Sequence, residues 1–140
     1  MRKTGKYSIR EAVARHPHLV WRQLAPHRVT ASVVKAIENP ENELWLSPLS
    51  LWELSYLVNK GRVVLDRGFE DWVATAMSRV PLREAPVTYE VALETRRVQL
   101  PHRDPVDRFL VATARVFDLA LVTADQRLLN AKGIRTLPNR

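Results

Sequence analysis

Four carboxylates stand at positions from which they could act together on a metal ion. Residues 102–114 read HRDPVDRFLVATA, which places Asp104 and Asp107 three residues apart at the start of an apolar helical pattern. Glu53 and Asp125 follow apolar stretches elsewhere in the chain. Hard cations such as Mg²⁺ prefer carboxylate oxygens contributed by several loops, with water completing the coordination. These acids therefore predict a candidate site for a hard cation such as Mg²⁺.

Each of these acids also has a purely structural explanation. The stretch DPVD at 104–107 is an efficient helix start, with aspartate at the N-cap, proline at the first helical position and an acid near the positive end of the helix dipole. Glu53 lies three residues after Ser50, the spacing of a capping box. Asp125 can begin a short helix. Helix capping and metal binding are both open at this point.

The elements that would position these acids alternate between helical and strand patterns. Helices are predicted over 31–39, 50–61, 69–80, 89–100, 107–117 and 125–133. Strands are predicted over 43–47, 119–123 and 134–138, with a brief extended piece around 86–88. This alternation is typical of a mostly parallel sheet covered by helices on both faces, which binds ligands beyond the carboxyl ends of its strands. All four acids can converge at that edge.

The composition is that of one folded domain. The chain has 140 residues, of which 46% are hydrophobic and 26% charged. It has no cysteine, which excludes disulfides and thiolate metal sites, and its histidines lack the spacing of a zinc site. The sequence contains no continuous apolar segment of the kind that forms a signal peptide or a membrane span, so a cytoplasmic protein is expected. Apolar patterns place three tryptophans in the expected core: Trp45, Trp52 and Trp72.

Positive charge is concentrated at the front of the chain. The net charge is +7, and residues 1–40 contain eight of the 22 Lys and Arg residues but only two of the 15 acids. A basic domain attracts polyanions, of which nucleic acid is the commonest in the cytoplasm. A solvated surface is the alternative explanation of the same charge.

Three stretches carry a more specific signal: LWLSPLSLWEL at 44–54, LPHRDPVDRFLVATA at 100–114 and LVTADQRLL at 121–129. In this order and at these separations they resemble PIN-domain proteins, specifically the VapC-type toxins of bacterial toxin–antitoxin pairs. The resemblance runs over residues 18–138. It implies a single PIN-like domain over 1–140, with a three-layer α/β/α fold around a mostly parallel sheet.

The resemblance also implies an activity. Members of this family cleave RNA with Mg²⁺ or Mn²⁺ held by four acids, and Glu53, Asp107 and Asp125 match the second, third and fourth of these. Asp104 matches a common neighbour of the third acid and is a further candidate metal ligand. Two-metal hydrolysis would activate a water and stabilise charge on the phosphodiester.

Partners follow from the same resemblance. It implies an RNA substrate, a small cognate antitoxin that covers the active site, and a homodimer, with no membrane association. Arg103 and Arg108 flank the acids and are candidates to bind RNA phosphates, as are Arg96, Arg97 and His102. Solvated arginines on a helix surface are the alternative.

The first acid of the quartet has no counterpart. Family members open with a buried strand that ends in aspartate, typically Leu-Leu-Asp-Thr, and spacing back from Trp21 puts that aspartate at position 15, which is Arg15. The stretch EAVAR at 11–15 is helix-prone and interrupted by charge, which makes it a poor interior strand. We therefore expect a first strand that is missing or altered, a marginal fold, and a poor nuclease or none.

The codons of residues 12–18, AVARHPH, suggest a cause for this departure. Shifted by one base, the degenerate codons can spell Leu-Leu-Leu-Asp-Thr-His, with the aspartate at position 15. We hypothesise that residues 1–17 are an atypical N-terminus read out of frame. A chance match among degenerate codons is the alternative.

Three functions are open from the sequence. The first is a VapC-like ribonuclease toxin, inactive if the first acid is essential. The second is a non-catalytic PIN-like module that binds antitoxin or RNA. The third is an unrelated basic α/β domain whose acids only cap helices, and it predicts that Glu53, Asp107 and Asp125 lie far apart.

Overall fold

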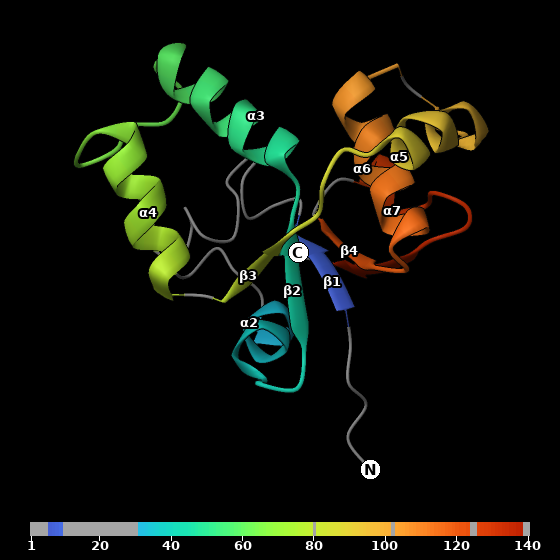
Figure 1. Ribbon diagram of the computed structural model, residues 1–140, viewed down its shortest axis with the longest axis horizontal. Coiled ribbons are helices and arrows are strands. Elements are labelled where there is room, and N and C mark those ends of the chain that lie inside the picture. The colour runs from blue at the N-terminus through green and yellow to red at the C-terminus, as the bar shows by residue number, and fades with distance from the viewer. Residues whose placement is uncertain (1–5, 10–30, 80, 102, 124–125, 139–140) are drawn as a thin grey trace.

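Helices and strands alternate along the chain in the computed structural model, which describes residues 6–9, 31–79, 81–101, 103–123 and 126–138 (Figure 1). The elements are β1 (Lys6–Ile9), α2 (Ala31–Glu38), β2 (Glu43–Leu46), α3 (Pro48–Asn59), α4 (Phe69–Arg79), β3 (Leu82–Glu84), α5 (Tyr89–Glu94), the 3₁₀ helix η2 (Thr95–Arg97), α6 (Pro105–Val116), β4 (Ala120–Thr123), α7 (Gln126–Leu129) and β5 (Arg135–Pro138). The predicted α/β class is confirmed.

The strands form a five-stranded sheet in the order β3-β2-β1-β4-β5. Each neighbouring pair of these strands runs parallel. Strand β1 lies in the middle, with Tyr7 opposite Leu44 of β2 on one side and opposite Ala120 of β4 on the other. The central position is thus filled by Lys6–Ile9. Residues 11–15, where the sequence placed the altered first strand, lie outside the described residues.

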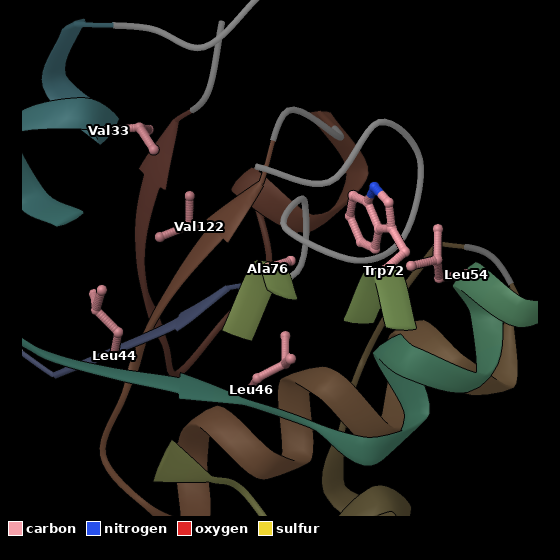
Figure 2. Close-up of a cluster of buried hydrophobic side chains, with 7 residues drawn as sticks. All are labelled: Val33, Leu44, Leu46, Leu54, Trp72, Ala76 and Val122. Atoms are coloured by element: carbon pink, nitrogen blue, oxygen red, sulfur yellow. The ribbon is translucent and has the colours of Figure 1, made fainter. Parts of the chain in front are cut away.

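Two hydrophobic clusters pack on opposite faces of the sheet. Successive strand residues point to opposite faces, so Val122 and Leu121 of β4 enter different clusters. Val122 packs with Val33, Leu44, Leu46, Leu54, Trp72 and Ala76 of α2, β2, α3 and α4 (Figure 2). Leu121 packs with Val91, Val98, Val111, Ala112 and Leu128, on the side of α5, α6 and α7. The result is the predicted three-layer α/β/α arrangement.

Helix α3 begins at Pro48, so the predicted capping box of Ser50 and Glu53 is wrong. Ser47 is the N-cap, and its Oγ accepts a hydrogen bond of 3.2 Å from the Leu49 amide. Proline at the first helical position loses no helical hydrogen bond and already has the helical φ. Ser50 is consequently a fully buried residue inside the helix, and Glu53 lies in its second turn.

The helix predicted over 89–100 is shorter in the structure. Helix α5 ends at Glu94, one 3₁₀ turn follows, and the backbone is extended at Val98, with φ −75° and ψ 128°. Val98 is buried in the same hydrophobic cluster as Leu121. Burying this side chain favours an extended chain that turns inward, and it disfavours a further turn of helix. The extended piece expected around 86–88 lies instead at Leu82–Glu84, as the edge strand β3.

The three tryptophans differ in burial, and the prediction for Trp52 is wrong. Trp72 is 6% exposed in the first cluster, and the half-buried Trp45 stacks on Phe117 with ring centroids 5.6 Å apart. Trp52 is 58% exposed on the outer face of α3, where it stacks with Tyr56. The apolar pattern of α3 is too continuous to show which side faces the core.

This difference predicts unequal effects of alanine substitution. Trp72→Ala should lower the free energy of unfolding by about 3–5 kcal/mol, because it leaves a cavity in the core. Trp52→Ala, the matched control, should cost about 1 kcal/mol or less, since it removes only an exposed ring and one stacking contact. Urea denaturation followed by circular dichroism measures both, and equal losses would contradict the observed burial.

Candidate functional site

The carboxyl ends of β2, β1 and β4 lie side by side at one edge of the sheet. Neighbouring strands are about 4.8 Å apart, so the ends of β2 and β4 lie about 10 Å apart with β1 between them. Helix α3 follows β2 after a single residue, and α6 leads into β4. In parallel α/β sheets this edge is where ligands bind.

Asp104 is the N-cap of α6. Its Oδ1 accepts hydrogen bonds from the amides of Val106, at 3.0 Å, and Asp107, at 3.5 Å. Its backbone carbonyl accepts one from the Arg108 amide at 3.2 Å. The structural explanation therefore holds for Asp104, and its role as a metal ligand stays a prediction.

Asp107 lies in the first turn of α6 and is fully buried, with 0% of its surface exposed. Asp104 supplies the capping oxygen, and Asp107 brings a second carboxylate, fully buried, into the same turn. A buried carboxylate is costly unless it is paired, hydrogen-bonded or bound to a metal. Its place near the start of α6 is chemically suited to a hard cation, because its oxygens are the donors that Mg²⁺ and Mn²⁺ prefer.

Glu53 lies on the other side of β1, in the helix that follows β2. It is half-buried, between the buried Ser50 and Leu54 and the exposed Trp52 and Tyr56. The sheet order thus brings a carboxylate from the β2 side and one from the β4 side to elements that adjoin the same edge. That the two side chains share one site stays a prediction.

Two of the predicted positions, Asp125 and Arg15, lie outside the described residues. In the sequence, Asp125 comes two residues after the end of β4. Among the residues that the structure describes, no group of three or more Asp, Glu, His or Cys side chains is close enough to hold a metal ion. Because Asp125 was not part of that set, the predicted three-acid site stays a prediction.

The arginines near the acids differ in their contacts. Arg103 is exposed, as expected for a residue that could reach RNA phosphates. Arg108 is half-buried, and its Nη1 donates to the backbone carbonyls of Val98, at 2.6 Å, and Thr95, at 3.2 Å. Arg97 is exposed and pairs with Glu94 at 3.1 Å. His102 lies outside the described residues, and RNA contacts by these side chains stay predictions.

Sequence reasoning missed the ion pairs of Glu94. The side chain of Glu94 is 14% exposed and pairs with Arg97 and with Arg115, whose Nη2 is 3.3 Å from Glu94 Oε2. Arg115 and Arg108 are two helical turns apart on α6, so they share one face. The seven-residue spacing of these two arginines was the signal in the sequence from which contacts between α6 and the preceding segment could have been predicted.

The structural role of Asp104 predicts how two substitutions will differ. Asp104→Ala removes the cap and should lower the free energy of unfolding by about 1 kcal/mol. Asp104→Asn keeps a side-chain oxygen in the same place and should cost at most a few tenths of a kcal/mol. Chemical denaturation measures both. Equal destabilisation by the two variants would show that the carboxylate charge matters and not the capping oxygen.

This chain is similar to known proteins in sequence and in fold. The sequence matches the PIN domain family over residues 20–134. It is 32% identical over 111 residues to Ribonuclease VapC22 of Mycobacterium tuberculosis (strain ATCC 25618 / H37Rv), a match that covers 77% of this chain and 82% of that protein. The family match begins downstream of β1.

A solved structure shares the fold. It is the crystal structure of VapBC2 from Rickettsia felis bound to a DNA fragment from their promoter, one chain of which aligns with a TM-score of 0.63 and 14% identity, covering 99% of this chain and 100% of that one. At this identity the likeness concerns the fold alone. Separately, none of the described helices is long and apolar enough to cross a membrane.

Proposed function

Because the chain belongs to the PIN-domain family and is of the VapC type, we propose that it is the toxin of a toxin–antitoxin pair and a ribonuclease dependent on Mg²⁺ or Mn²⁺. The observation that carries the proposal is the complete burial of Asp107 in the first turn of α6. Aspartate is almost never fully buried unless it has a partner, and a metal ion is one such partner.

Glu53, Asp107 and Asp125 would hold the metal. When bound, the ion would lower the pKa of a water and stabilise charge on the phosphodiester. Glu53 is carried by α3, which follows β2, and Asp107 is carried by α6, which leads into β4. Asp104, through its bond to the Asp107 amide, fixes the backbone that carries this carboxylate, and it is a further candidate ligand. The exposed Arg103 would neutralise RNA phosphates at the rim.

The missing first acid limits this activity in the chain as it stands. The expected position carries Arg15, and the residue that follows β1 in the sequence is Arg10. Under either assignment a basic residue stands where the family has an acid. Changing a group that only supports a metal ligand costs 10–100-fold in affinity or activity, so losing a ligand should cost at least as much. We propose that metal binding is weak and that RNA cleavage is poor or absent.

Metal binding and RNA cleavage test this proposal together. We expect weak Mn²⁺ binding by electron paramagnetic resonance, further weakened by Asp107→Asn and by Glu53→Gln, and little Mg²⁺-dependent cleavage of RNA. Asp118→Asn is the matched control, because the side chain of Asp118 is 91% exposed at the far end of α6. Binding that is insensitive to Asp107→Asn would contradict the site.

Two other outcomes are informative. Strong Mg²⁺-dependent cleavage that is lost in Asp107→Asn would support the site but contradict the predicted weakness. Absence of any Mn²⁺ binding, with retained binding of RNA or antitoxin, would favour the alternative of a non-catalytic PIN-like module.

We also propose that residues 1–17 are read out of frame. The gene decides this directly, because its bases at codons 12–17 either can or cannot encode Leu-Leu-Leu-Asp-Thr-His in the shifted frame. Replacing residues 12–17 by that sequence should raise Mn²⁺ affinity about 10–100-fold and increase Mg²⁺-dependent cleavage, because it restores a fourth acid. The same replacement with asparagine in place of the aspartate is the control, and equal gains in both would contradict the proposal.

We propose a cognate antitoxin and a second copy of this chain as protein partners, with RNA as substrate in the cytoplasm. Large apolar side chains exposed on two helices support a partner-binding role. On α3 these are Trp52 and Tyr56, and on α5 they are Tyr89, 93% exposed, and Leu93, 69% exposed.

A further inference from the structure

Arg108 connects the first turn of α6 to the end of the helical segment before it. Its Nη1 donates to the carbonyl oxygens of Val98 at 2.6 Å and of Thr95 at 3.2 Å. The last carbonyl groups of a helix have no hydrogen-bond partner within the helix. At the end of η2, the Val98 amide donates to Thr95 O at 3.3 Å, which satisfies only part of this need. The guanidinium therefore completes the end of η2 at a point where Val98 is buried.

This contact closes a short loop that carries both acids. Val98 and Arg108 are ten positions apart, and Asp104 and Asp107 lie between them. At the other end of the loop, the Arg108 amide bonds Asp104 O, and Asp104 Oδ1 bonds the amides of the first turn. The same residue is thus tied to the N-cap through its backbone and to the end of η2 through its side chain.

We propose that Arg108 is a positioning residue for Asp107, holding the first turn of α6 in the orientation that buries the Asp107 carboxylate. The metal part of this inference rests on the proposed function, whereas the fixing of the loop does not. An arginine suits the task because its planar group carries several donors and stays charged. The phosphate contact predicted for Arg108 would change RNA affinity and leave the order of the loop unchanged.

Arg115 provides a matched control on the same helix. Its Nη1 donates to Arg97 O at 3.3 Å and its Nη2 pairs with Glu94, so it also connects α6 to η2 and α5. It lies two turns from Arg108, at the end of α6 far from Asp107. Loss of Arg115 should loosen η2 and lower stability without disturbing the first turn of α6.

The experiment compares Arg108→Met with Arg115→Met in the full chain without ligand. Amide hydrogen exchange read by NMR should become about tenfold faster at the non-proline residues of 98–107 in Arg108→Met and change less than about twofold there in Arg115→Met. Unchanged exchange at Val106 and Asp107 in Arg108→Met would overturn the inference. If that variant does not fold, Arg108→Gln, which is too short to reach both carbonyls, takes its place under the same criterion.

Mn²⁺ titration of the same proteins separates this inference from the proposed function. If the unsubstituted chain binds Mn²⁺, its affinity should fall about tenfold in Arg108→Met and stay within about twofold in Arg115→Met. Equal affinity in Arg108→Met would overturn the positioning role. If the unsubstituted chain binds no Mn²⁺, the proposed function fails, and the exchange at Asp107 alone decides whether Arg108 positions it.

Discussion

The structure depends on the backbone pairing of one four-residue strand. In the described sheet, β1 pairs with β2 on one side and β4 on the other, and it joins the β2-β3 half to the β4-β5 half. Leu44 and Leu46 of β2 reach the same cluster as Val122 of β4, across the face of β1. Without that strand, this cluster and the two sides of the candidate site would no longer be held together.

The first turn of α6 shows how two nearby acids come to have different roles. Asp104 turns its carboxylate to the helix amides, where the positive end of the dipole stabilises it. Asp107, three residues later in the same turn, is fully buried. Arg108 follows on the next position and turns its guanidinium back to the η2 carbonyls. Three consecutive functions, capping, carboxylate burial and loop closure, thus occur within a single turn.

Sequence reasoning was most accurate where a local signal and the global fold agree. The DPVD start of α6 has proline and aspartate at the positions that a helix start requires, so its capping was predictable without tertiary contacts. The start of α3 was not, because Ser47 and Ser50 are both plausible caps and Pro48 decides between them. The exposure of Trp52 and the end of α5 depend on which face each segment buries, which packing determines and local sequence does not.

The strand order also indicates where the first acid of the proposed site would lie. Because β1 lies between β2 and β4, a carboxylate at its carboxyl end would stand between the groups carried by α3 and α6, about 5 Å from the end of each flanking strand. An arginine in that position would add a positive charge where a divalent cation has to approach, and charges a few ångströms apart repel strongly when water is largely excluded. In the proposed site, the loss of this acid would therefore remove the central ligand and would also oppose occupation by metal at the remaining acids.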